Sequence, residues 1–304
     1  MKSTNSEQPL VSVIMPTYNH AKFIGKAIDS VLNQTYKNLE LIVIDNYSDD
    51  DTEKIVDSYE DKRIIYLKFR NNGIIAASRN HGIKHSHGDY IAFLDSDDWW
   101  YPEKLKVVAK YFQKADIIYH NLDIYTPRGK KYFKRIKGRP LKKPPFVDLM
   151  VNGDALANSG VVIKKSIINR VGGLSEETSL VAAEDSDLWL KISMITDKFM
   201  YIPKTLAAYW IWEGNATEIS EKQLSRVKAL SDKHIPFLAS EDRRQHEMFL
   251  SYTIGRIKQK MGFRDDALEL FKVSIKSHNL KLKLKSVYLI MLIYARRITT
   301  VRTL

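Results

Sequence analysis

The chain of 304 residues contains no cysteine and no long apolar run. Without cysteine, a disulfide framework and a thiolate metal site are excluded, which fits a reducing compartment. The apolar run at residues 287–295 has nine residues, well short of the roughly twenty that a membrane-spanning helix needs. The first residues, MKSTNSEQP, lack the apolar core of a signal peptide. We therefore expect a cytoplasmic protein, peripheral on the inner face of the cell membrane.

Acidic residues are missing from two segments. Residues 128–143, RGKKYFKRIKGRPLKK, hold nine Lys or Arg, and residues 271–304 hold eight more. Together these cations exceed the net charge of +12, so the remaining chain is slightly acidic. This asymmetry predicts a polyanionic partner, either nucleic acid or anionic lipid, although solvated basic loops are a plain alternative for the first segment. The tail LKLKLKSVYLIMLIYARR has the pattern of a helix that lies on an anionic membrane.

Short apolar runs alternate with helical patterns through the first 120 residues. The runs lie at residues 10–15, 39–44, 63–69, 89–94 and 115–120. Nearly continuous apolar strands separated by helices predict a parallel sheet that is covered on both faces. In such sheets, ligands bind beyond the carboxyl ends of the strands.

The regular alternation ends near residue 120. A basic loop at 126–145 precedes a strand that turns into a helix, and residues 181–193 read as a helix with acids near its start. From about residue 220 the pattern is helical, with a hairpin across 246–277. We expect a catalytic domain at 1–218, with a nucleotide-binding half at 10–120 and an acceptor half at 121–218, and a helical, membrane-associating extension at 219–304.

Each of the first four strands ends in a polar cluster. Because the carboxyl ends of parallel strands share one edge of the sheet, these clusters should converge on one crevice. The fourth cluster has Asp-x-Asp spacing, which suits Mg²⁺ or Mn²⁺ bound with a nucleotide diphosphate. A helix cap is the simpler alternative for these aspartates. The clusters are Pro16-Thr17-Tyr18-Asn19, Asp45-Asn46, Arg70-Asn71-Asn72-Gly73 and Asp95-Ser96-Asp97-Asp98.

Other polar residues near the crevice each allow two interpretations. Asp45 suits a hydrogen bond from a base imide N–H, or an Asx turn. Thr17 and Tyr18 suit contact with a nucleotide, or a turn. Arg79 suits a phosphate, although an arginine on a helix surface is usually solvated.

A second acidic pair follows the apolar stretch at residues 181–183. If Glu184 and Asp185 face a cavity, one carboxylate could take the proton of a sugar hydroxyl in a displacement reaction. The alternative is an acidic cluster that only stabilises the start of a helix through the helix dipole. The residues alone leave both interpretations open.

Together these motifs resemble family 2 of the nucleotide-sugar glycosyltransferases, which have the GT-A fold. The resemblance covers about residues 10–215. It implies an α/β fold, a GT-A nucleotide-binding sandwich with a mostly parallel central sheet, followed here by a C-terminal helical extension. The segments that carry it are VSVIMPTYNHAKFIGKAIDSVLNQTYKNLELIVID (11–45), NNGIIAASRNHGI (71–83), GDYIAFLDSDD (88–98) and AED (183–185).

The resemblance also implies roles for individual residues. Asp97 would bind the Mn²⁺ or Mg²⁺ that bridges the donor diphosphate, and Asp185 would deprotonate the acceptor hydroxyl with Glu184 beside it. The family inverts, so an α-linked donor would give a β-linkage. The expected nucleotide-binding residues are Pro16, Thr17, Tyr18, Asn19, Asp45, Asn71, Arg79, Asp95 and Ser96. The residues expected on the acceptor or sugar side are Asn158, Ser159 and Trp212.

Two positions depart from the family pattern. Relatives commonly have Asp-Asp-Gly-Ser after the second strand, where this chain has Asp45-Asn46-Tyr47-Ser48 and keeps the first Asp. Relatives often have Tyr-Arg-x-His in the segment that reads AYWIWEGNAT here (208–217), and the His can approach the metal. Trp212 lies in this segment instead, so metal binding would rest on Asp97, the diphosphate and water. Trp212 itself either stacks on a sugar ring or packs in the core.

The sequence therefore predicts an inverting, metal-dependent glycosyltransferase. It would transfer a hexose or N-acetylhexosamine from a UDP-sugar to a glycan acceptor and form a β-glycosidic bond. The basic segments favour an acceptor on the membrane, such as a polyprenyl-diphosphate oligosaccharide in O-antigen or capsule synthesis. A homodimer is compatible with the sequence.

Two other classes of protein share some of these sequence features. A nucleotidyltransferase acting on sugar phosphates would need a Gly-rich basic phosphate loop after the first strand, and PTYNHAKF is not one. A non-enzymatic polyanion-binding protein is suggested by the basic charge. An acidic crevice without metal would repel the phosphates of a nucleic acid, so we expect no nucleic-acid partner.

Overall fold

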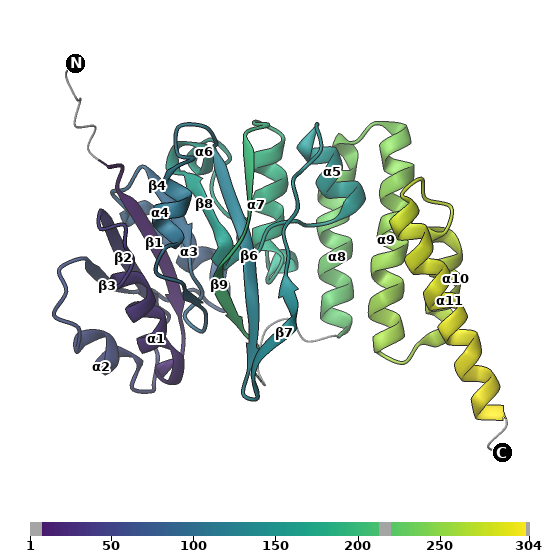
Figure 1. Cartoon of the computed structure of the whole chain (residues 1–304), viewed down its shortest axis with the longest axis horizontal. Helices are drawn as coiled ribbons and strands as arrows, with labels where there is room; N and C mark the ends of the chain where they lie inside the picture. Colours follow the sequence, from purple (N-terminus) through teal and green to yellow (C-terminus); the bar gives the residue numbers. More distant parts are fainter. Residues whose placement is uncertain (1–7, 213–219, 302–304) are drawn as a thin grey trace. The chain divides into compact units, whose positions relative to one another are not determined.

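The computed structural model describes residues 8–212 and 220–301 (Figure 1). The chain divides into two compact units. The first comprises Met1–Lys142 and Ala155–Glu213, and the second comprises Lys143–Asp154 and Gly214–Leu304. Residues 143–154 therefore group with the helical unit, which the expected boundary at residue 218 does not anticipate.

The described part of the first unit is built on a nine-stranded sheet. Its order is β3-β2-β1-β4-β8-β6-β9-β5, and β7 pairs with β6. The strands β3, β2, β1 and β4 form a parallel half, whereas β8, β5 and β7 pair antiparallel with their neighbours. The strands are β1 (Val11–Thr17), β2 (Leu39–Asp45), β3 (Ile64–Lys68), β4 (Tyr90–Phe93), β5 (Trp99–Trp100), β6 (Ile117–Thr126), β7 (Gly129–Ile136), β8 (Val161–Lys164) and β9 (Phe199–Trp210).

The parallel half brings the polar strand ends together. β1 pairs with β2 from Val11 opposite Leu39 to Thr17 opposite Asp45, so both strands end at the same edge. β4 lies on the other side of β1 and runs in the same direction. The predicted α/β fold with a mostly parallel central sheet is confirmed. The sequence did not predict that β8 lies between β4 and β6, where it brings the short 3₁₀ helix η1 (Asn158–Gly160) beside β4.

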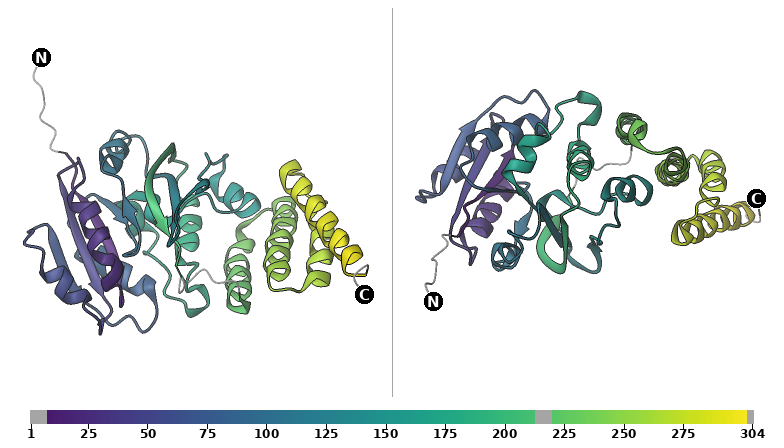
Figure 2. Two further views of the ribbon diagram at one scale, coloured as in Figure 1. Left: turned by 60° about the horizontal axis from the view of Figure 1, so that its bottom comes forward. Right: turned by 90° about the horizontal axis from the view of Figure 1, so that it is seen from above.

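Helices cover both faces of the parallel half (Figure 2). On one face, the apolar stripe of α1 packs against the odd-numbered residues of β1 together with α4. On the other face, α3 approaches closely because residue 82 is glycine: a Cβ there would lie 2.6 Å from Ile44 Cδ1 and 2.8 Å from Ile14 Cγ2. The α-helices of this unit are α1 (Ala21–Leu32), α2 (Thr52–Asp57), α3 (Ile75–His85), α4 (Lys104–Ala109), α6 (Lys165–Arg170) and α7 (Glu184–Ser193), and a second 3₁₀ helix is η2 (Thr178–Leu180).

The second unit is helical throughout its described residues. The predicted hairpin is confirmed as α9 and α10, which are joined at Gly262 with a φ of +97°. Phe271 of α10 forms a small core with Leu289 and Ile293 of α11. Helix α5 joins this unit because His246 Nδ1 lies 2.7 Å from the Met150 carbonyl oxygen. The helices are α5 (Pro145–Asn152), α8 (Glu221–His234), η3 (Ile235–Phe237), α9 (Ser240–Lys260), α10 (Arg264–Ser274) and α11 (Leu280–Val301).

The helices in the described ranges are all too short or too polar to span a membrane.

Candidate active site

Hydrogen bonds join the loops that follow the three parallel strands β1, β2 and β3. The Asn46 amide donates to the Thr17 carbonyl oxygen at 3.0 Å, and the Asn71 amide donates to Asn46 Oδ1 at 2.9 Å. The Asn19 amide donates to Ser48 Oγ at 2.9 Å. These bonds fix the predicted nucleotide-binding loops against one another at the carboxyl edge of the sheet.

Unusual backbone conformations gather in the same region. Among the described residues other than glycine, four have positive φ: Asn19 (53°), Tyr47 (58°), Asn72 (52°) and Ala182 (63°). The first three lie after β1, β2 and β3, and Ala182 lies just before α7 with its acidic start. Such conformations are disfavoured for residues with a Cβ and concentrate at functional sites. The positive-φ positions after β1, β2 and β3 therefore lie at the same edge of the sheet as the polar residues.

Asp45 organises the loop after β2. It is fully buried, and its Oδ1 accepts hydrogen bonds from the Ser48 amide (3.0 Å) and hydroxyl (2.6 Å). Its Oδ2 accepts a bond from the Tyr66 hydroxyl at 2.6 Å. The Asx-type turn that the sequence offered as an alternative is therefore present. Contact between Asp45 and a nucleotide base stays a prediction.

The other predicted nucleotide-binding residues around these loops differ in exposure. Pro16 and Thr17 are buried at the end of β1, whereas Tyr18 is 52% exposed. Asn71 donates from Nδ2 to Ser78 Oγ at 2.9 Å and accepts from the Gly73 amide. Tyr18 is therefore available for stacking on a flat ligand, while Asn71 shapes the loop after β3.

Arg79 connects two acidic segments that are far apart in the sequence. Its Nη2 donates to Asp95 Oδ1 at 2.7 Å, and its Nη1 donates to Glu184 Oε1 at 2.5 Å. The Arg79 and Glu184 side chains are 4% and 5% exposed. Burial lowers the pKa of Arg79, but attraction by Asp95 and Glu184 outweighs it and raises that pKa overall. Arg79 thus holds the segment after β4 to the start of α7, and its contact with a nucleotide phosphate stays a prediction.

The remaining residues of the Asp-x-Asp segment have different neighbours. Ser96 Oγ lies 2.7 Å from His20 Nδ1 and is buried. Asp97 Oδ2 accepts a hydrogen bond from Trp212 Nε1 at 3.0 Å. Burial and the charge of Asp95 raise the pKa of Asp97. A nearby cation would offset both effects on Asp97.

Trp212 donates a hydrogen bond to Asp97 and also belongs to an aromatic cluster. Its ring lies 5.1 Å from Phe23 and 5.9 Å from His20 between centroids. Packing and polar contact therefore coexist, and stacking on a sugar stays a prediction. The sequence did not single out His20, because one histidine after a turn carries no distinctive pattern.

Asp98 belongs to a buried network beneath the crevice. It accepts hydrogen bonds from Ser159 Oγ at 2.6 Å and from the Trp210 amide at 2.9 Å. Burial and the charges of Asp97 and Asp95 raise its pKa well above the ordinary value. Lys104 is fully buried, donates to the Ser159 carbonyl oxygen at 2.9 Å and lies 3.4 Å from the Trp100 ring centroid.

Two of the three residues predicted on the acceptor or sugar side, Asn158 and Ser159, lie next to Asp95. Asn158 Nδ2 donates to Asp95 Oδ1 at 3.1 Å, and the Asp95 amide donates to Ser159 Oγ at 3.3 Å. Ser159 is engaged at both its hydroxyl and its carbonyl oxygen, so it serves the architecture of the site. Asn158 Oδ1 is buried and has no hydrogen-bond partner within the described ranges.

Glu184 and Asp185 begin α7 and differ in their surroundings. Glu184 is buried against Arg79. Asp185 is half-buried and accepts a hydrogen bond from the Ser186 amide at 2.7 Å. The more accessible carboxylate at the mouth of the site is therefore that of Asp185.

The oxygen atoms around Asp95 and Asp97 could supply only part of the coordination shell of a hard cation. Asp95 and Asp97 supply carboxylate oxygens, and Asn158 supplies an amide oxygen. Within residues 8–212 and 220–301, no group of three or more His, Cys, Asp or Glu could enclose a metal. Mg²⁺ and Mn²⁺ commonly take one or two protein carboxylates and complete their shells with phosphates and water. The residues present fit this sparse mode of binding.

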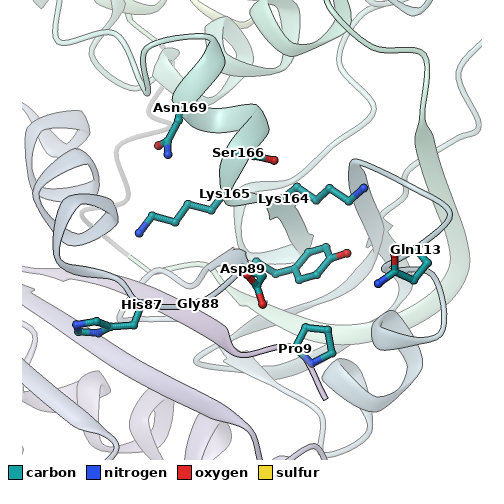
Figure 3. A pocket seen from close by; sticks show the side chains of 10 residues that line it. Pro9, His87, Gly88, Asp89, Gln113, Lys164, Lys165, Ser166 and Asn169 are labelled. Atoms are coloured by element: carbon teal, nitrogen blue, oxygen red, sulfur yellow. The ribbon is translucent and has the colours of Figure 1, made fainter. Parts of the chain in front are cut away.

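A cavity of about 460 Å³ lies at the opposite edge of the sheet, beside the start of β4. Figure 3 shows Lys164 and Lys165 of this cavity extending in opposite directions. Lys164 Nζ lies 3.1 Å from Asp116, Lys165 Nζ donates to the Ser86 carbonyl oxygen at 2.5 Å, and His87 Nδ1 lies 3.0 Å from Glu40. Lys164, Lys165 and His87 of this cavity are therefore each engaged by a protein group.

Replacing Arg79 with methionine should lower the free energy of unfolding by about 3–5 kcal/mol, because two buried carboxylates would lose their cation. Arg63→Met is the matched control: Arg63 pairs with Asp61 at 2.7 Å near the surface, so its loss should cost about 1 kcal/mol or less. Urea unfolding of both variants measures the difference. Equal small effects would contradict a structural role for the Arg79 pairs.

Comparison with known proteins gives the family. The family described as "Glycosyl transferase family 2" matches residues 12–171. An uncharacterized glycosyltransferase of Rickettsia typhi is 33% identical over 231 residues, which is 74% of this chain and 71% of the relative. WfaP of Escherichia coli is 33% identical over 183 residues, covering 60% of this chain and 70% of WfaP. It is named as a UDP-Glc:alpha-D-GlcNAc-diphosphoundecaprenol beta-1,3-glucosyltransferase.

Solved structures support the fold independently. The crystal structure of S. aureus TarS 1-349 in complex with UDP-GlcNAc has a TM-score of 0.63 and 20% sequence identity to this chain. The match covers 90% of this chain and 82% of that structure. The fold, the converging strand ends and the family match agree with one another. The chain is a glycosyltransferase that belongs to glycosyl transferase family 2.

Proposed function

We propose that this chain is an inverting, metal-dependent enzyme that transfers a hexose or N-acetylhexosamine from a UDP-sugar to a glycan acceptor, forming a β-glycosidic bond. The observation that carries the proposal is a set of buried polar atoms at the crevice that lack hydrogen-bond partners in the described structure. They are Thr17 Oγ1, Arg79 Nε, Asn158 Oδ1 and Glu184 Oε2. Unpaired buried polar atoms are costly, so a polar ligand such as a sugar nucleotide is the expected occupant.

The loops after β1, β2 and β3 are proposed to bind the nucleotide. Exposed Tyr18 would stack on the uracil, while the fixed turn around Asp45 would present polar groups to the base. UDP-GlcNAc in TarS and UDP-Glc in the name of WfaP support a uridine nucleotide as the carrier. The identity of the sugar would be set by contacts near Asp95 and Asn158.

Asp97, with Asp95 beside it, would hold Mn²⁺ or Mg²⁺ together with the donor diphosphate. The bound cation would supply electrostatic stabilisation of the leaving diphosphate. The protein positions both carboxylates through Trp212 and Arg79. Because Trp212 occupies one oxygen of Asp97, the protein would contribute few ligands and depend on the diphosphate for the rest.

Asp185 is proposed as the general base. It would accept the proton of the acceptor hydroxyl while that oxygen attacks the anomeric carbon. The bond from this carbon to the diphosphate oxygen breaks, and UDP leaves with the electron pair. Attack opposite the leaving group inverts the configuration. Glu184 is already paired with Arg79, so its role is to position the site.

The acceptor is proposed to be a lipid-linked glycan in O-antigen or capsule synthesis. The name of WfaP states a diphosphoundecaprenol-linked acceptor, and the basic tail of this chain would favour an anionic membrane surface. The enzyme would then act as a peripheral protein on the inner face of the cell membrane, as a monomer or a homodimer. A nucleotidyltransferase finds no support in the loop after β1, which has no glycine from Pro16 to Phe23.

UDP release across a panel of UDP-sugars tests the donor and the metal together. We expect slow hydrolysis of one donor with Mn²⁺ or Mg²⁺, and its loss with EDTA or in the Asp97→Ala variant. Lipid-linked acceptor extracts should accelerate the release. Full activity of Asp97→Ala in the presence of EDTA would contradict a metal-dependent transferase.

Asp185→Asn should lower kcat by about 10²- to 10⁴-fold, because removing a general base has effects of this size. UDP binding, measured by calorimetry, should change little. Glu176→Gln is a suitable control: Glu176 is exposed and accepts a hydrogen bond from Asn80 Nδ2, which glutamine can also do. A kcat for Asp185→Asn equal to that of the control would rule out Asp185 as the base.

A further inference from the structure

The helical unit contains a cavity of about 430 Å³ between the α9–α10 turn and α11. On one side it is lined by Arg256, Lys260 and Arg264, and on the other by Leu289, Leu292 and Ile293. Both groups of residues belong to helices that pack together within this unit (Figures 1 and 2). The cavity therefore offers positive charge and an apolar wall at the same place.

The positive charge of this cavity is uncompensated. None of the described residues that line it is acidic. Asp266, in the first turn of α10, does not line the cavity and pairs with Lys258 at 2.5 Å. Arg256 is held by Gln259, which accepts from its Nη1 at 2.6 Å. Three cations without a carboxylate favour an anionic occupant.

Helix α11 carries an exposed apolar stripe next to the cavity. Leu284, Tyr288 and Met291 are 60%, 57% and 57% exposed, and their spacing places them on one face of the helix. Leu292 of the cavity wall lies one turn after Tyr288, so the wall continues into the stripe. The opposite face of α11, with Leu289 and Ile293, is buried against Phe271.

The charges around the stripe decide between two kinds of occupant. Lys281, Lys283 and Lys285 are exposed at the start of α11, so this surface and the cavity are both positive. A second copy of the chain would oppose positive charge with positive charge. An anionic bilayer supplies negative headgroups and an apolar phase at the same interface, which matches both features.

We propose that this cavity binds the phosphate group of an anionic membrane lipid, with the stripe of α11 lying in the bilayer interface. Arg256, Lys260 and Arg264 contact the phosphate, and Leu292, the lining residue on the side of the stripe, contacts the start of the lipid chains. This inference deepens the membrane association that is part of the proposed function, and it is separate from donor and metal binding.

Point variants of the full chain test this proposal better than a truncation, because deleting α11 would expose the core around Phe271. Lys260→Gln with Arg264→Gln removes two exposed cations of the cavity. Lys222→Gln with Lys228→Gln removes the same charge from exposed positions on α8. Thermal melting verifies that both double variants fold.

Binding to vesicles is measured by co-sedimentation with phosphatidylcholine alone and with added phosphatidylglycerol. We expect tight binding only with phosphatidylglycerol. Each cation near an anionic membrane contributes roughly fivefold to the affinity. The cavity variant, which lacks two cations, should therefore bind these vesicles about 30-fold more weakly than the unmodified chain. The affinity of the α8 control should change by less than about threefold. Equal losses in the two variants, or equal binding to both kinds of vesicle, would overturn the proposal.

Two further measurements distinguish a lipid phosphate from free phosphate, and lipid binding from the transferase reaction. A short-chain, soluble phosphatidylglycerol should displace the protein from vesicles at much lower concentration than inorganic phosphate does. Equal displacement would identify a free-phosphate site and overturn the lipid assignment. UDP release from the donor alone should be unchanged in the cavity variant, so failure of lipid binding is distinguishable from failure of the proposed transferase.

Discussion

Arg79 is a buried cation that holds two carboxylates from distant parts of the chain. It lies on α3 and reaches Asp95 at the end of β4 and Glu184 at the start of α7. A guanidinium group can make both contacts at once because its donors lie in a fixed planar fork. Without it, each buried carboxylate would face a large desolvation penalty. The position of the Asp-x-Asp segment relative to α7 depends on this arrangement.

The acidic residues around Arg79 support the proposal that the site binds a further cation. Asp97 and Asp98 are desolvated close to Asp95, and burial and mutual repulsion raise the pKa of both. Lys104 is also buried near Asp98, and burial lowers its pKa well below the ordinary value although the charge of Asp98 opposes this. A divalent cation with a diphosphate would restore the balance at the mouth of the crevice. The proposed chemistry and the stability of the carboxylates thus share one electrostatic cause.

The sequence predicted the elements of the site better than the contacts between them. Apolar runs and turn residues located β1, β2 and β4, and parallel geometry then required their polar ends to converge. No local pattern indicates that Arg79 reaches Glu184, which is 105 residues away. The same limit applies to Trp212 and Asp97, and to β8, whose antiparallel insertion brings Asn158 to Asp95. These contacts arise from tertiary packing, which spacing along the chain does not encode.

A crystal structure with UDP and Mn²⁺ would test the central claim most directly. The account predicts the uracil beside the loops after β1 and β2, and the diphosphate and metal next to Asp97. Arg79 should remain bound to Asp95 and Glu184 while its Nε and Asn158 Oδ1 face the ligand. UDP in another cavity, such as that of Figure 3, or Arg79 turned away from both carboxylates, would contradict the account.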